Sequence, residues 1–302
     1  MVGGGKRAAR VAQGALMGAA NTVPGVSGGT LALMFGIYER LIGAIRDGAR
    51  AVLRFVRGDL RGGLAGLRAV DWALLLPLAA GAFLTVVLLA GLLETGLEEH
   101  PEAMAGLFLG LVVASIVVSW RLPDWDPARL ALMSVVGVGV FAALGWQSGP
   151  VGDPSPPLLF AAGAIAICAM ILPGLSGSFL LLMFGMYEAV LEVIDDRLLV
   201  DAAIFGVGAV LGLALFASLL TRLLERHHDT ILVVLIGLMV GSLRVLWPWP
   251  NGVGVIGDTA DTSISGTGLD WPPAGDLSAP LLLAAAAFGV VLAVDRFARS
   301  RA

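Results

Sequence analysis

Hydrophobic residues fall in runs long enough for helices that cross a lipid bilayer. A transmembrane helix takes about 17–25 mostly apolar residues, and six stretches of this kind stand between polar connections. They are Asp71 to Leu93, Ala103 to Trp120, Arg129 to Trp146, Val200 to Leu220, Thr230 to Trp247 and Ala279 to Phe297. The pattern predicts an all-α polytopic membrane protein in which these segments are transmembrane helices.

Two further apolar stretches, Val11 to Ile45 and Leu158 to Ile194, carry a Pro/Gly/Ser cluster in the middle. Proline and glycine interrupt a continuous helix, so each stretch is predicted as two half-helices that form a re-entrant hairpin. Basic residues before the first stretch mimic a secretory signal. The same broken pattern recurs in mid-chain, however, and we therefore expect no cleaved signal.

An internal repeat organises the chain. Pro24 to Gly29 (PGVSGG) matches Pro173 to Ser178 (PGLSGS) at an offset of 149, and MFGIYE after the first copy matches MFGMYE after the second. Further on, His100 pairs with His227 at an offset of 127, so the first copy carries 22 extra residues. We predict a single membrane domain, 1–302, with repeats over 1–147 and 148–302, each a broken hairpin followed by three transmembrane helices.

The charges indicate how the two repeats are oriented. If both hairpins are re-entrant, three crossings separate them, and 16 of the 19 basic residues then share one side with both chain ends. The opposite side holds Arg197 and most of the acidic residues of the connections. Basic residues accumulate in short cytoplasmic loops. The sequence therefore predicts an inverted repeat in the cell (plasma or inner) membrane, with cytoplasmic N- and C-termini.

The first repeat's additional residues form an arginine-rich insertion, 46–68. Six arginines stand there, mostly three or four positions apart, with apolar residues between them. This spacing predicts a basic amphipathic helix on the cytoplasmic leaflet, where attraction to anionic lipids stabilises it. A role in fixing the topology is enough to explain it.

Composition narrows the class of protein. Apolar residues make up 58% of the chain and charged residues 14%, against about 25% charged in a soluble domain. A net charge of −4 argues against a nucleic-acid partner, which needs a concentrated basic face. Cys168 is the one cysteine, which leaves no intrachain disulfide or cysteine-based metal cluster, and we expect no metal and no cofactor.

The hairpin tips are the candidate binding site. A Pro-Gly-x-Ser-Gly tip that leads into a helix presents free N–H groups and hydroxyls, which suit an anion and most naturally a phosphate. Glycines that only allow close helix packing are the alternative, but two matched copies are typical of a transporter's central site. The candidate phosphate ligands at the tips are Asn21, Thr22, Gly25, Ser27, Gly28, Gly29, Thr30, Ser176, Gly177 and Ser178.

Charged residues inside apolar segments are the remaining candidates, because such residues are costly in a membrane. Arg244 is predicted near the outer end of a transmembrane helix, where its guanidinium could bind phosphate or extend to the interface. Glu39, Arg40 and Glu188 stand about 12 residues past the tips, or about 18 Å along a helix. They are candidates for gating or coupling, with solvated rim charges as the alternative.

The paired motifs also resemble a known family. The run Asn21 to Thr30 (NTVPGVSGGT), followed by Phe35 to Glu39 (FGIYE), is similar to the polyprenyl-phosphate transporter family of prokaryotic membrane proteins, long known only as a domain of unknown function. The resemblance covers nearly the whole chain. It implies that the substrate is undecaprenyl phosphate or a related polyprenyl phosphate, returned from the outer to the cytoplasmic leaflet for cell-envelope synthesis.

The second copy departs from the first. Met170, Ile171 and Leu172 replace the Asn-Thr-Val of the first tip, and Phe179 replaces Thr30. We therefore expect the first tip to provide more polar contacts than the second.

The predicted function is that of a translocase that works by alternating access. We do not expect the protein to be an enzyme. An inside-negative potential opposes the inward movement of an anion, so coupling to a proton or another cation is expected. A small-anion transporter or channel is the alternative. An intramembrane lipid phosphatase is disfavoured because the three histidines fall at helix ends, and a scaffold for cell-wall enzymes is a further alternative. A homo-oligomer is compatible with the sequence.

Overall fold

The computed structural model describes residues 2–21, 28–145, 151–249, 269 and 275–299, and these residues form helices and their connections without a strand. The helices are α1 Val2–Asn21, α2 Gly28–Met34, α3 Tyr38–Val56, α4 Leu60–Ala69, α5 Trp72–Glu99, α6 Pro101–Ser119, α7 Pro127–Ala143, α8 Pro156–Ile171, α9 Gly177–Met183, α10 Tyr187–Asp195, α11 Leu199–Ser242 and α12 Ser278–Arg299. The predicted all-helical fold is confirmed.

Most of each of the six long apolar segments lies in a helix. The segments that begin at 200 and 230 are the two parts of α11, which bends at His227 (φ −137°, ψ 48°). Among the described residues, α6 and α11 are long and apolar enough to cross a membrane, and α4 with Trp72–Thr85 would make a third span across a 73° bend. Because α7 has 17 residues, or about 25 Å, it falls short of a core of about 30 Å.

The hairpin segments contain one more break than the sequence predicts. Two half-helices are expected in each, but a helix of seven residues, α2 or α9, is followed by a second turn and then by α3 or α10. Gly36 (φ 65°) and Gly185 (φ 66°) stand in these turns, in the left-handed conformation that glycine adopts without steric cost. The two-helix prediction is therefore wrong, and the MFGIYE and MFGMYE motifs mark the turns.

Corresponding parts of the two repeats also match in backbone geometry. Tyr38 and Tyr187 begin α3 and α10, and they are 149 positions apart. His100 (φ −137°, ψ 54°) separates α5 from α6 in the same conformation as His227, which stands 127 positions later. The sequence repeat is therefore a repeat of local structure as well.

Glycines let helices of one repeat pack backbone against backbone. A Cβ atom at Gly14 of α1 would lie 2.1 Å from the carbonyl oxygen of Leu78 in α5. At the matching Gly163 of α8 it would lie 2.2 Å from the carbonyl oxygen of Phe205 in α11. Thus α1 packs against α5 as α8 packs against the first part of α11.

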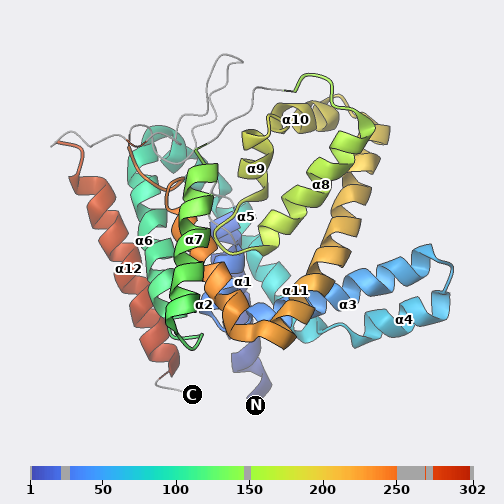
Figure 1. Cartoon of the computed structure of the whole chain (residues 1–302), viewed down its shortest axis with the longest axis horizontal. Helices are drawn as coiled ribbons and strands as arrows, with labels where there is room; N and C mark the ends of the chain where they lie inside the picture. Colours follow the sequence, from blue (N-terminus) through green and yellow to red (C-terminus); the bar gives the residue numbers. More distant parts are fainter. Residues whose placement is uncertain (1, 22–27, 146–150, 250–268, 270–274, 300–302) are drawn as a thin grey trace.

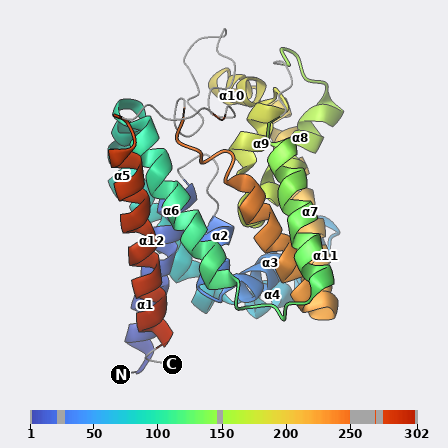
Figure 2. The same cartoon turned by 60° about the vertical axis from the view of Figure 1, so that its left-hand side comes forward.

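The last helix of each repeat packs against the other repeat. Figures 1 and 2 show α12 beside α6, and α7 beside the second part of α11. A Cβ atom at Gly110 of α6 would lie 2.1 Å from the carbonyl oxygen of Ala284 in α12. On the other side, one at Gly241 of α11 would lie 2.6 Å from Cβ of Val140 in α7. This exchange of final helices joins the repeats around a core of buried side chains from α2, α3, α6 and α11.

The arginine-rich insertion forms a helical hairpin, which corrects the prediction of a single helix over 46–68. The chain turns at Gly58 (φ 82°), and Asp59 caps α4 by accepting a hydrogen bond from the Gly62 N–H at 2.8 Å. Phe55 of α3 packs against Gly63 of α4. In Figure 1 this hairpin extends sideways at the lower end of the molecule, where α1 begins and α12 ends.

Candidate functional site

The second tip lies between α8 and α9, at mid-height in Figure 1. Gly174 adopts φ +82°, a conformation that other residues rarely adopt. A Cβ atom there would lie 2.7 Å from Cα of Met239 and 2.9 Å from Oγ of Ser242. The tip is thus fixed against the end of α11, and glycine is required by both conformation and space.

The polar groups of this tip stand where α9 begins. The hydroxyl oxygens of Ser176 and Ser178 lie 3.0 Å apart, and Ser178 is exposed. Gly177 is buried, and a Cβ atom there would lie 2.5 Å from the carbonyl oxygen of Ala166 in α8. The second tip therefore carries two hydroxyl groups on either side of a tightly packed glycine.

The first repeat contacts this tip directly. The Gly174 N–H donates a hydrogen bond of 2.9 Å to Oγ1 of Thr30, which is fully buried in α2. The hydroxyl of Tyr38 donates a bond of 3.2 Å to the carbonyl oxygen of Ile171, at the end of α8. The structure thus brings Thr30 to the second tip, and the Thr30 side chain positions that tip.

The other residues predicted at the first tip are only partly described. Gly28 and Gly29 are buried in the first turn of α2. Asn21 ends α1, and its side chain lies outside the described part of the chain. Thr22, Gly25 and Ser27 also fall outside the described residues, so their role stays a prediction.

Arg244 follows α11 and reaches α7. Its Nη1 donates a weak hydrogen bond of 3.4 Å to the carbonyl oxygen of Phe141, and its Cζ lies 5.1 Å from the centre of the Phe141 ring. The Nε is buried without a hydrogen-bond partner, and among the described residues no carboxylate forms an ion pair with this side chain. A buried donor without a partner costs about 1–3 kcal/mol, which an anionic ligand would offset.

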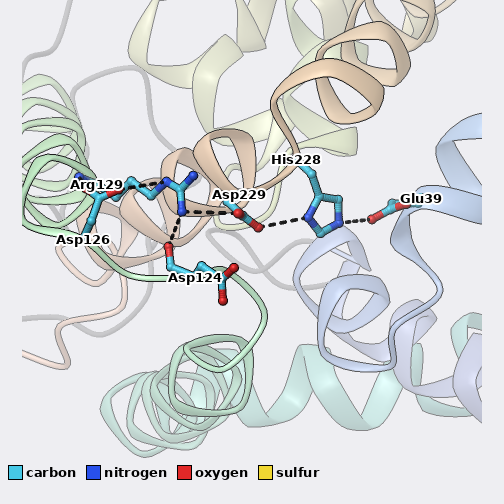
Figure 3. Close-up of polar contacts among 6 residues, drawn as sticks. All are labelled: Glu39, Asp124, Asp126, Arg129, His228 and Asp229. Atoms are coloured by element: carbon cyan, nitrogen blue, oxygen red, sulfur yellow. Dashed lines mark hydrogen bonds and ion pairs between the residues drawn. The ribbon is translucent and has the colours of Figure 1, made fainter.

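A chain of charged side chains lies at the opposite end (Figure 3). Glu39 of α3 contacts Nε2 of His228 at 2.7 Å, and Nδ1 of His228 lies 3.3 Å from Asp229. Asp229 in turn pairs with Arg129 of α7 at 3.2 Å. The network joins α3, the bend of α11 and the start of α7.

The environment of His228 at this bend favours its protonated form. Partial burial lowers the pKa of His228, but the hydrogen bonds and negative charges of Asp229 and Glu39 outweigh burial, and the net pKa is raised. The sequence places His228 at a helix end but gives no sign of the contact with Glu39, which is 189 residues away. No sequence pattern connects these two positions.

The other gating candidates lie apart from one another. Arg40 is exposed and pairs with Asp71 at 2.5 Å. Glu188 is exposed in the first turn of α10, and Figure 1 shows α10 and α3 at opposite ends of the molecule. Within the described residues, no group of His, Cys, Asp or Glu side chains could hold a metal ion.

Comparison with known proteins gives consistent matches over most of the chain. Residues 17–263 match the family model described as VCA0040-like, undecaprenyl phosphate translocase-like. A polyprenyl-phosphate transporter of Vibrio cholerae is 39% identical over 241 residues, which cover 78% of this chain and 76% of that protein. A polyprenyl-phosphate transporter of Staphylococcus aureus is 27% identical over 257 residues, which cover 79% and 85%.

No solved structure matches the chain. The family model nevertheless spans the broken segments, the bend of α11 and Arg244. The chain therefore belongs to the VCA0040-like family of undecaprenyl phosphate translocase-like membrane proteins.

Proposed function

We propose that this protein is a polyprenyl-phosphate transporter that returns undecaprenyl phosphate, or a related polyprenyl phosphate, from the outer to the cytoplasmic leaflet for recycling in cell-envelope synthesis. The family match and the names of both relatives support the substrate class. A phosphate headgroup needs a polar path across about 30 Å of hydrocarbon. Non-helical backbone at membrane depth is tolerated where it lines such a path.

In the proposed arrangement, the two repeats are inverted in the cell membrane and the broken hairpins are re-entrant. The matched turns at Gly36 and Gly185 support this arrangement, and so does the placement of α3 and α10 at opposite ends. The arginines of the α3–α4 hairpin then face the cytoplasm together with both chain ends, as the distribution of basic residues favours.

The observation that carries the proposal is the contact between the repeats at Thr30 and Gly174. A contact between the two halves of an inverted pair, beside a broken hairpin, suits a central site for alternating access. The phosphate ligands in this proposal are the predicted residues of both tips. Their described hydroxyls are those of Thr30, which also accepts from the Gly174 N–H, and of Ser176 and Ser178. Arg244 receives the anion near the outer end of the path, where a guanidinium can bind it through two parallel hydrogen bonds.

Gating and coupling are assigned to the two ends of the path. Glu39 contacts His228 at the α3 end, and in this proposal the pair gates that end. Glu188 takes the corresponding position at the other end. An inside-negative potential opposes inward movement by about 2.3 kcal/mol per charge per 100 mV. We therefore propose that a proton or another cation moves with the substrate, with Glu39 and Glu188 as its carriers.

Transport in proteoliposomes tests the proposal. Undecaprenyl phosphate placed in one leaflet should reach the other much faster with the protein than without it, and inorganic sulfate or chloride should not compete. Lipid movement equal to that in protein-free vesicles would contradict the proposed function. Competition by the small anions would favour the small-anion alternative, and transport insensitive to both a pH gradient and voltage would contradict coupling.

A further inference from the structure

An apolar groove lies between α7, the second tip and α9, with a volume of about 490 Å³. Val140 and Ala143 of α7 form one wall, and Leu180, Met183 and Phe184 form the other. Leu175 of the tip closes one side. Because Ala143 and Phe184 are exposed, the groove opens to the surroundings of the protein. The described side chains that line it are all apolar, so it suits a hydrocarbon chain.

Polar groups adjoin the groove. Leu175 directly precedes Ser176, the N-cap residue of α9, and Leu180 stands one helical turn further on. The Leu180 N–H donates to the carbonyl oxygen of Ser176 at 3.1 Å.

Leu144 also lines the groove and precedes Gly145, where a Cβ atom would lie 2.5 Å from the Arg244 guanidinium carbon. Residues that line the groove are thus direct chain neighbours of Ser176 and of Gly145, which packs against Arg244.

We propose that this groove binds the first isoprene units of the polyprenyl chain while the phosphate occupies the path beside it. The proposal rests on the proposed function. An amphiphile with an anionic head and a single apolar chain satisfies both surfaces at once. Head and chain are therefore recognised together.

Filling the groove tests this assignment. Ala143→Trp places an indole in it, and Ala203→Trp is the matched control, because Ala203 is also an exposed alanine that lines an apolar groove, formed by α11 and Phe160 of α8 with a volume of about 460 Å³. Binding of farnesyl phosphate and of inorganic phosphate is measured for the full chain in nanodiscs. Burial of each methylene group strengthens binding, so loss of a few methylene contacts weakens binding about tenfold or more.

The expected result is a Kd for farnesyl phosphate that rises at least tenfold in Ala143→Trp, with little change for inorganic phosphate and no change in Ala203→Trp. Ala143→Phe inserts a smaller side chain and should give an intermediate loss of affinity. It replaces Ala143→Trp in the test if the indole impairs folding. Unchanged farnesyl phosphate binding in both Ala143 variants, or an equal loss in the control, would overturn the groove assignment alone. Failure of the unmodified chain to bind farnesyl phosphate would overturn the proposed function as well.

Discussion

Two arginine side chains lie at opposite ends of α7, one from α7 itself and one from the residues after α11. They differ in what their guanidinium groups contact. Arg129, at the start of the helix, contacts the Asp124 carbonyl oxygen at 2.6 Å and the carboxylates of Asp126 and Asp229 at 3.5 and 3.2 Å. Arg244 reaches the far end of the same helix, where, within the described part of the chain, it makes one weak hydrogen bond and its buried Nε has no partner. An arginine whose donors bind carboxylates and carbonyl oxygens of the protein stabilises the fold. An arginine with unpaired hydrogen-bond donors is suited to bind an anion.

Removal of the Arg244 guanidinium should have the largest effect. Hydrogen bonds to charged groups contribute about 1.5–3 kcal/mol, which corresponds to roughly 10- to 100-fold in affinity. Arg244→Ala should therefore slow transport of undecaprenyl phosphate in proteoliposomes by that factor while the melting temperature stays nearly constant. Arg68→Ala, at an exposed position of α4, is the control. Equal transport by the two variants would contradict a role for Arg244 in binding.

The opposite result is expected for Arg129. Arg129→Ala removes contacts to three residues near the bend of α11, and the partly exposed side chain makes the loss about 1–2 kcal/mol of unfolding free energy. Thermal unfolding should detect the loss, while the Kd for farnesyl phosphate stays unchanged. If Arg129→Ala unfolded at the same temperature as the unmodified chain but bound farnesyl phosphate more weakly, the contrast between the two arginines would be contradicted.

Displacement of Arg244 without its removal should have a smaller effect. In Gly145→Ala the new Cβ would lie 2.5 Å from the Arg244 Cζ, so this flexible side chain must shift. We expect transport to fall several-fold. Gly139→Ala is the matched control, since nothing lies within 4 Å of a Cβ there and alanine favours the helix by about 0.5–1 kcal/mol. Unchanged transport in both Gly145→Ala and Gly139→Ala would contradict the claim that transport depends on the position of the Arg244 side chain.

The smallest effect concerns His228. Because its pKa is raised, the charged contact with Glu39 is fully formed below the ordinary histidine pKa and is lost as pH rises through the raised value. An exposed pair of this kind contributes about 0.2–1 kcal/mol. After division by the intrinsic base-catalysed exchange rate, the protection of amides at the start of α3 should therefore fall as pH rises above the ordinary histidine pKa. His228→Gln should remove this pH dependence, and His228→Lys should keep the region protected; a pH response that persists in both would contradict the pair.

Much of the helical framework could be predicted from the sequence because apolar run lengths and the two repeat offsets determine where helices begin and bend. The second break at Gly36 and Gly185 was missed, since one glycine within an apolar run does not by itself indicate a left-handed turn. Gly58 and Asp59, likewise, divide an arginine pattern whose spacing fits a continuous helix.

The contacts that join the repeats were not predictable in the same way. Repeat alignment pairs Thr30 with Phe179, yet Thr30 bonds to Gly174, so the two tips contact through positions that do not correspond. The contact of Glu39 with His228 also joins different parts of the two repeats. Such contacts depend on how the helices pack, and a single sequence does not contain that information.

Density for a bound lipid phosphate in the full chain tests the central claim most directly. The account predicts phosphate within hydrogen-bond distance of the Arg244 guanidinium or of the Ser176 and Ser178 hydroxyls, with its chain in the groove between α7 and α9. Phosphate bound only elsewhere would contradict it. One such place is the cavity of about 550 Å³ between α6 and α12, which Arg121 and Arg296 line.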